Sequence, residues 1–142
     1  MKTSCGIIPF RVNGDGTVEF FVSHPTNSGN YWAFCKGQME DDETEHRTAI
    51  REFEEETGVS LTDVKEDDLI YLGKVQQSKK KNVVAFGLNY PNIDETKCHS
   101  NFLEDGVTPE NDEFKWLAFS KLKGVTHKKH IKFYQDLIEI LS

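Results

Sequence analysis

The chain has few cysteines and no long apolar run. Its 142 residues include three cysteines, Cys5, Cys35 and Cys98, at irregular spacing. Their odd number and the lack of a CxxC or Cys/His pattern argue against a disulfide framework or a zinc site, so we expect reduced thiols. No apolar stretch approaches the roughly 20 residues of a membrane-spanning helix, and the first residues show no signal-peptide pattern. We therefore expect a cytoplasmic protein with no membrane partner.

The chain also has fewer basic residues than acidic residues. Lysine and arginine total 17 against 24 acidic residues, which gives a net charge of −7. This balance argues against charge-driven binding to nucleic acid. Internal repeats and low-complexity linkers are absent, and the 16 aromatic residues are enough for a substantial core. We expect a single domain over residues 1–142.

Much of the acidic excess lies in one stretch, residues 37–59, with the sequence GQMEDDETEHRTAIREFEEETGV. Nine acidic side chains stand there beside two arginines. Carboxylates at this density repel one another and weaken a helix unless a cation holds them together. Glu52, Glu55 and Glu56 stand at helical spacing, so a helix would place them on one face. Hard oxygen ligands grouped in this way suit Mg²⁺ or Mn²⁺.

The same stretch carries the boundaries of a helix. Thr44 and the two aspartates before it offer N-caps, and Gly58 offers a left-handed stop. A solvated, charge-rich helix is the alternative interpretation of the acidic run. Four residues recur at helical spacing and should face the core: Ala49, Ile50, Phe53 and Thr57.

The stretch resembles the signature of the Nudix hydrolases, G-x5-E-x7-R-E-U-x-E-E-x-G-U, in which U is a bulky apolar residue. Every defined position of the signature is matched. The matching residues are Gly37, Glu43, Arg51, Glu52, Phe53, Glu55, Glu56, Gly58 and Val59.

Nudix enzymes cleave a phosphoanhydride bond in a nucleoside diphosphate linked to another moiety, X. The resemblance implies a Mg²⁺-dependent hydrolase, with Mn²⁺ as a possible substitute. It implies that Glu55 and Glu56 are metal ligands and that the carbonyl of Gly37 joins the metal shell. Glu52 is implied as a further ligand or as the group that orients the attacking water. Arg51 belongs to the same catalytic set, in a structural role in which it pairs with acids of the preceding loop such as Glu43.

Three lysines are candidates for substrate binding. Lys36 precedes the signature and is placed to meet a phosphate, unless it is an ordinary surface lysine. Lys80 and Lys81 belong to a basic triplet between two expected strands. They either hold the phosphates of a long substrate or form a charged hairpin tip.

Two further acids come near the end of a long polar segment, residues 91–113. A glutamate before a strand that carries tryptophan is a familiar Nudix feature, because that loop reaches over the metal site. We assign Glu110 as a candidate metal ligand and Glu113 as a candidate base, the alternative being solvated acids. His127 and His130 stand among lysines and are expected at the surface rather than as ligands.

The expected elements agree with the α/β/α sandwich that the resemblance implies, in which a mixed β-sheet lies between helices. Residues 13–16 should form the turn of a hairpin. The C-terminal helix should pack on the sheet through residues that include Tyr134 and Ile138. We expect strands at 5–12, 17–23, 31–34, 69–76 and 83–90, with helices over the acidic stretch and at 127–141.

The choice of X is set outside the signature. The segments SCGIIPFR, WAFCKG and KKKNVVAF are similar to small Nudix enzymes that act on dinucleoside polyphosphates, and this is our leading hypothesis. The proline that follows the signature in many ADP-ribose hydrolases is missing, since no proline occurs between Pro25 and Pro91. Tyr71 lies too close to the signature for the tyrosine of many diadenosine polyphosphate hydrolases.

Other substrates and one other class of function stay open. ADP-ribose, NAD-type dinucleotides, nucleoside triphosphates, capped RNA ends and inositol pyrophosphates are alternative substrates. A non-catalytic nucleotide-binding module is the alternative from another class, although such domains usually have a damaged signature. Tyr31, Trp32 and Phe102 either stack on a base or belong to the core. The sequence shows no pattern of an oligomer interface, so monomer and dimer both stay open.

Overall fold

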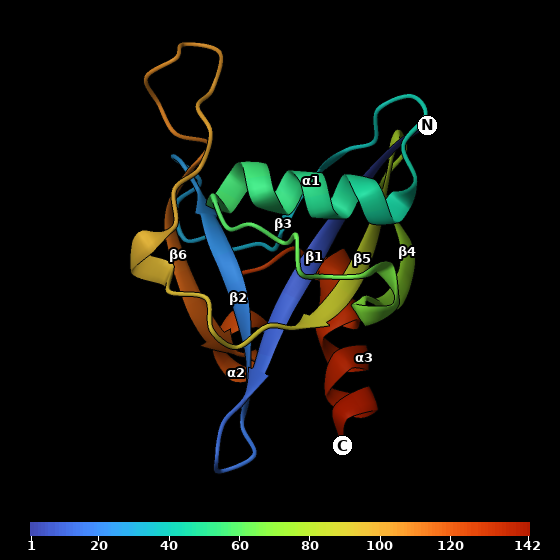
Figure 1. The fold of residues 1–142 in the computed structure, drawn as a ribbon, viewed down its shortest axis with the longest axis vertical. Helices are drawn as coiled ribbons and strands as arrows, with labels where there is room; N and C mark the ends of the chain where they lie inside the picture. The colour runs from blue at the N-terminus through green and yellow to red at the C-terminus, as the bar shows by residue number, and fades with distance from the viewer.

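A computed structural model describes all residues from 1 to 142. Six strands and three α-helices alternate with three short 3₁₀ turns (Figure 1). None of the helices is long and apolar enough to cross a membrane. The strands are β1 (Lys2–Val12), β2 (Val18–Pro25), β3 (Cys35–Gln38), β4 (Ile70–Ser78), β5 (Lys81–Asn89) and β6 (Asn111–Ala118). The helices are α1 (Glu45–Thr57), α2 (Phe119–Leu122) and α3 (Ile131–Leu141), and the 3₁₀ turns are η1 (Glu66–Asp68), η2 (Glu95–Lys97) and η3 (Lys128–His130).

The strands form one mixed sheet in the order β4-β5-β1-β2-β6, with β3 paired to β1. The central strands β1 and β5 run parallel, whereas the other pairs are antiparallel. In β1, Cys5 and Ile7 face one side of the sheet, and Ile8 and Phe10 face the other. This strand therefore joins two separate hydrophobic cores.

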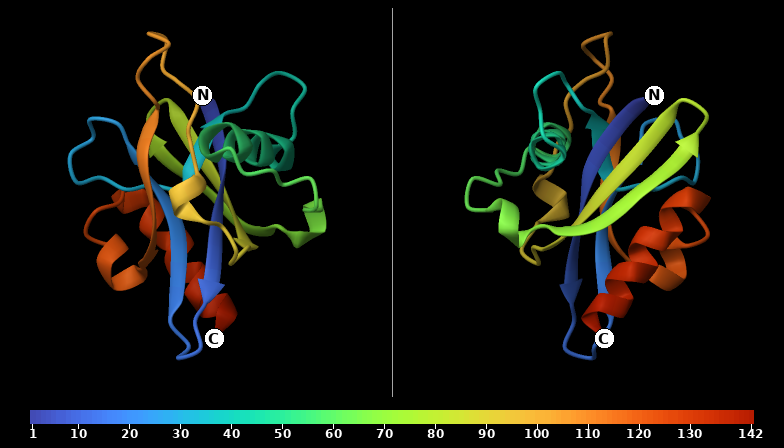
Figure 2. Two further views of the ribbon diagram at one scale, coloured as in Figure 1. Left: turned by 60° about the vertical axis from the view of Figure 1, so that its left-hand side comes forward. Right: turned by 90° about the vertical axis from the view of Figure 1, so that its right-hand side faces the viewer.

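Helices cover both faces of the sheet. Helix α1 packs over the core that contains Phe53 and Phe86, while α3 packs over the core that contains Phe20 and Leu137. The two helices lie on opposite sides of the strands (Figure 2). The predicted α/β/α sandwich with a mixed sheet is therefore confirmed.

Most of the expected elements are present, with one shift near the signature. The predicted strand at 31–34 is wrong: this segment makes a single bridge, between Ser23 and Ala33, and the strand begins at Cys35. The backbone N–H of Trp32 donates instead to the carbonyl of Val125 at 2.8 Å, so this segment has no continuous partner strand. The apolar pattern at 31–34 reflects burial rather than strand pairing.

The expected position of His130 at the surface is also wrong. Its side chain is fully buried beside Phe34, and its Nε2 lies 2.7 Å from Oε1 of Gln77. Burial, followed by the charge of Lys36, lowers the pKa of His130 to about 3. The 3₁₀ turn η3 turns His130 inward, so the neighbouring lysines give a misleading picture of its environment.

Acid should destabilise the fold through His130. Its folded-state pKa lies below that of an unfolded histidine, so the stability is present above about pH 6.5 and is lost as the pH falls toward the folded value. Between pH 7 and pH 5 this loss amounts to about 2 kcal/mol. Denaturant unfolding at both pH values should show that His130→Gln removes this part of the pH dependence. The control is Tyr134→Phe, a buried substitution that removes no imidazole and should keep the wild-type dependence; an unchanged dependence in His130→Gln would contradict the assignment.

Candidate active site

Helix α1 is fixed at both ends in the way the sequence predicts. The hydroxyl of Thr44 accepts a hydrogen bond from the backbone N–H of Arg47 at 3.2 Å, which makes it the N-cap. Gly58 ends the helix at φ +75°, a conformation that favours glycine. Ala49 and Phe53 are fully buried against the sheet. The acidic face of α1 is therefore presented by a rigid, well-anchored helix.

Arg51 ties the preceding loop to this helix. Its Nε and Nη2 donate to the carboxylate of Glu43 at 2.7 and 2.9 Å, and Nη2 also donates to the carbonyl of Gln38 at 3.2 Å. Its Nη1 donates to Glu52 at 2.9 Å. Hydrogen bonds from Arg51 and then from the backbone of Glu40 lower the pKa of Glu43 to about 2. The pairing of Arg51 with Glu43 that the sequence suggested is thus present.

Gly37 and Glu52 are in close contact. A Cβ atom at Gly37 would lie 2.0 Å from the carboxylate carbon of Glu52, far inside contact distance. The pairing of β3 with β1, in which Gly37 stands opposite Cys5, fixes the backbone there. The absence of a side chain at Gly37 is what allows the Glu52 carboxylate to reach the strand.

Glu56 is the most buried acid of the helix. Its Oε1 accepts a hydrogen bond from the Asn111 side chain at 3.3 Å, whereas its Oε2 is buried without a partner. Burial, followed by the charge of Glu52, raises the pKa of Glu56 to about 8. Sequence reasoning missed Asn111, because nothing distinguishes this asparagine from the other polar residues of its segment.

The structure separates the two acids near β6. Glu110 is half-buried, and burial followed by the charges of Glu52 and Glu55 raises its pKa. Glu113 is exposed and forms an ion pair with Lys115 at 3.6 Å. Glu110 therefore belongs to the carboxylate cluster, which we define as Glu52, Glu55, Glu56 and Glu110, and Glu113 lies outside it.

A β-bulge lies between Asn111 and Glu113. Glu113 pairs with His24, but the next pair joins Asn111 to Pro25, so the pairing of β6 shifts by one residue at Asp112. The shift directs Asn111 toward α1, where it contacts Glu56. A regular strand would have placed Asn111 and Glu113 on the same face.

The carboxylate cluster has the chemistry of a divalent metal site, although its side chains do not form a ready-made group of three or more ligands. Glu52 and Glu55 are turned toward Arg51, whose Nη1 lies 2.9 and 3.3 Å from them. The unpartnered oxygen of Glu56 and the raised pKa values of Glu56 and Glu110 indicate acids crowded without enough positive charge. Carboxylate oxygens in this state suit Mg²⁺ or Mn²⁺.

The predicted lysines come together in a cleft next to this cluster. A cavity of about 800 Å³ is lined by five lysines, here called the lysine cleft, and also by Gly37. The parallel pairing of β1 with β5 places Lys2 opposite Lys81, and the pairing of β3 with β1 brings Lys36 to the same end of the sheet. Its five lysines are Lys2, Lys36, Lys79, Lys80 and Lys81.

The pKa of Lys36 is affected both by a lysine of the cleft and by an acid of the carboxylate cluster. Burial and the charge of Lys81 lower its pKa to about 8, while the charge of Glu56 opposes this shift. Its Nζ lies 5.6 Å from the ring centroid of Phe34. A phosphate group in the lysine cleft would therefore find Lys36 near the carboxylates.

The acidic helix and the sandwich describe the site, and comparison with known proteins identifies the family of the chain. The family model of the NUDIX domain matches residues 4–137. The chain therefore belongs to the Nudix hydrolase family.

The chain is similar to proteins named as dinucleoside tetraphosphatases and to proteins named as mRNA-decapping enzymes. The chain is 25% identical over 136 residues to the asymmetrical bis(5′-nucleosyl)-tetraphosphatase of Mus musculus, covering 91% of this chain and 87% of that protein. It is 29% identical over 103 residues to mRNA-decapping enzyme subunit 2 of Saccharomyces cerevisiae, covering 72% of this chain but 10% of the yeast protein. Among solved structures, the binary complex of the C. elegans Ap4A hydrolase superposes with a TM-score of 0.72 at 19% identity, over 99% of this chain and 98% of that one.

A methyl group at Gly37 should disable the site. In Gly37→Ala the added Cβ displaces the Glu52 carboxylate, and a displacement of about 1 Å at a reacting centre can cost about 100-fold in rate. We expect kcat/KM for the best nucleotide substrate to fall by about that factor. The control is Gly14→Ala, whose added Cβ would meet no atom within 4 Å. Wild-type activity in Gly37→Ala would show that the close contact with Glu52 has no role in catalysis.

Proposed function

We propose that this Nudix protein hydrolyses a phosphoanhydride bond of a dinucleoside polyphosphate and requires Mg²⁺, which Mn²⁺ can replace. One observation carries the proposal: Gly37 touches the Glu52 carboxylate and also lines the lysine cleft. A site for a divalent cation and a site for a chain of phosphates thus adjoin at one residue. The similarity to the mouse tetraphosphatase over most of both chains supports this choice of substrate.

The proposed metal ligands are the carboxylates of Glu52, Glu55, Glu56 and Glu110, together with the carbonyl of Gly37. A bound Mg²⁺ would supply positive charge that neutralises phosphate oxygens and activates a water molecule. Glu52, held by Arg51 and by its contact with Gly37, is placed either to bind the cation or to orient that water.

The other residues position the substrate. Lys36, Lys80 and Lys81 bind phosphate oxygens, because their ammonium groups line the cleft that a polyanion would enter. Arg51 acts through Glu43 and Glu52, so we regard it as a positioning residue. Glu113 does not enter this assignment, because its carboxylate pairs with Lys115.

A capped RNA end is the second candidate substrate. It also contains a phosphate chain between two nucleosides, and the similarity to yeast mRNA-decapping enzyme subunit 2 favours it. The chain spans about a tenth of that yeast protein. A capped oligonucleotide therefore belongs in the same substrate panel. The intact carboxylate set favours an enzyme over a non-catalytic binding module.

The first experiment is a substrate panel with Mg²⁺ and with Mn²⁺, with products resolved by chromatography, for the wild type and Glu56→Gln. The panel contains dinucleoside polyphosphates, ADP-ribose, NAD, nucleoside triphosphates, inositol pyrophosphates and a capped RNA. We expect metal-dependent cleavage of the dinucleoside polyphosphates and a fall of at least about 100-fold in Glu56→Gln. Turnover that is the same in the wild type and Glu56→Gln, or no turnover of any substrate, would refute the proposed mechanism.

The lysine cleft can be tested separately. Lys80→Gln and Lys81→Gln each remove one positive charge that faces the phosphate chain, so we expect KM to rise by about 3- to 10-fold with a smaller change in kcat. Added salt should weaken the wild type more than either variant. Lys121→Gln, an exposed substitution on α2 outside the cleft, is the matched control. Unchanged KM in both cleft variants would remove these lysines from substrate binding.

A further inference from the structure

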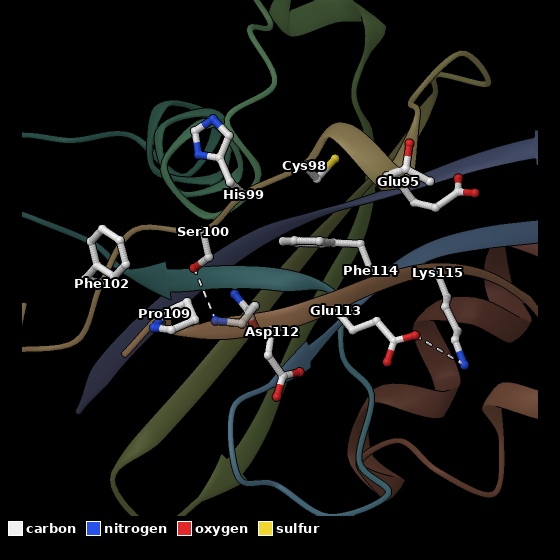
Figure 3. Close-up of a pocket in the computed structure, with 12 residues that line it drawn as sticks. Glu95, Cys98, His99, Ser100, Phe102, Pro109, Asp112, Glu113, Phe114 and Lys115 are labelled. Atoms are coloured by element: carbon white, nitrogen blue, oxygen red, sulfur yellow. Dashed lines mark hydrogen bonds and ion pairs between the residues drawn. The ribbon is translucent and has the colours of Figure 1, made fainter. Parts of the chain in front are cut away.

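A second cavity, of about 690 Å³, is connected to the carboxylate cluster through Asn111, although none of the four acids lines it. It lies between the segment 95–102 and strand β6, and Figure 3 shows the residues that line it. Asn111 lines this cavity and donates to Glu56, whereas Gly37 lines the lysine cleft and touches Glu52. Since Glu52 and Glu56 are about one helical turn apart on α1, the two cavities approach the cluster through different residues.

The cavity ends at Phe102, whose ring lies beside Pro109 in Figure 3. The backbone of Phe102 is fixed, because it forms a bridge with Pro109 and because the N–H of Glu110 donates to the carbonyl of Asn101 at 2.9 Å. The N–H of Asn101 in turn donates to the carbonyl of Glu55 at 3.1 Å. Phe102 is thus held by the same short ribbon that positions Glu110, and the ribbon is tied to the acidic helix.

The residue Phe102 is 59% exposed, and no other aromatic ring packs against its side chain. Phe114, by contrast, is buried with its ring stacked on Phe21. The other aromatic residue with comparable exposure, Tyr71, lies on β4 and packs against Phe86. Phe102 is therefore the aromatic face that is open to a ligand next to the carboxylate cluster.

The lysine cleft offers no such face. Its one apolar lining residue is Met1, and it contains no aromatic side chain. A nucleotide with its phosphates on the lysines has no ring there on which its base could stack. The second cavity supplies that ring, and Asn111 and Gly37 connect the two cavities to Glu56 and Glu52, respectively.

We propose that Phe102 and the cavity beside it bind a nucleobase of the substrate by stacking. This inference rests on the proposed function, because it assumes a substrate that extends across the carboxylate cluster. Stacking on one aromatic face accepts any base, so the subsite selects for the presence of a base rather than its identity. A purine covers more of the ring than a pyrimidine and should bind more tightly.

The test is equilibrium binding of the fluorescent nucleotide etheno-ADP, followed by anisotropy in the presence of Mg²⁺, with inorganic pyrophosphate as a competitor that has no base. We expect Phe102→Ala to raise the Kd for etheno-ADP about tenfold and to leave competition by pyrophosphate unchanged. Phe102→Trp should restore tight binding. Leu103→Ala removes the neighbouring exposed apolar side chain and is the matched control, with binding like the wild type.

The outcomes of this test differ from those of the substrate panel. Equal affinity for etheno-ADP in Phe102→Ala and the wild type would overturn the subsite, even if dinucleoside polyphosphates are cleaved. An equal loss of pyrophosphate competition would also overturn it, because the ribbon rather than the stacking face would then be responsible. A Phe102-dependent affinity in a protein that cleaves no dinucleoside polyphosphate would support the subsite and refute the proposed function.

Discussion

The arrangement of the site depends on one guanidinium group among four carboxylates. Arg51 lies 2.7 Å from Glu43, 2.9 Å from Glu52, 3.3 Å from Glu55 and 3.7 Å from Glu40. Without this positive charge the acidic loop and the acidic helix would repel each other. The planar guanidinium also donates to the Gln38 carbonyl, so it fixes the backbone of the loop as well as its charge. The loop position, and hence the place of Gly37, follows from these contacts.

Arg51 leaves part of the negative charge uncompensated. Its hydrogen bonds reach Glu43 and Glu52, whereas Glu56 has an unpartnered oxygen and a pKa raised to about 8. Burial of an acid in this way costs stability unless another cation is present. The unpartnered oxygen belongs to one of the proposed metal ligands, whereas Glu43, near the start of the signature, has both carboxylate oxygens paired with Arg51. The pairing of Arg51 with Glu43 thus differs electrostatically from the environment of Glu56, whose pKa is raised.

The sequence was sufficient for features that depend on local spacing. The helix with its Thr44 cap and Gly58 stop follows from capping preferences, and the turn between β4 and β5 follows from polar residues between two apolar runs. The convergence of Lys36, Lys80 and Lys81 depends on strand pairing, which spacing alone did not specify. The sequence suggested Lys36 separately from the pair Lys80 and Lys81, and the pairing of β3 and β5 with β1 brings them together.

The features that the sequence missed arise from irregular backbone. A bulge at Asp112 places Asn111 and Glu113 on different faces, so Asn111 contacts Glu56 while Glu113 pairs with Lys115. A 3₁₀ turn directs the side chain of His130 into the core, although its neighbours in the sequence are charged. Such one-residue shifts alter which face a side chain occupies without altering the composition of the segment. The periodicity of apolar residues does not reveal such shifts, so nothing in the sequence indicates that Asn111 contacts Glu56.

The family signature and the two surfaces proposed to bind the substrate come from different parts of the chain. The signature spans residues 37–59, and three of its acids, Glu52, Glu55 and Glu56, lie on α1. The lysine cleft comes from β1, β3 and the turn between β4 and β5, and the cavity at Phe102 comes from the ribbon before β6. Relatives named for dinucleoside tetraphosphates and for mRNA decapping both match this chain at 25–29% identity. On the proposed function, the flanking surfaces can differ among relatives while Arg51, Gly37 and the acids of α1 keep their geometry.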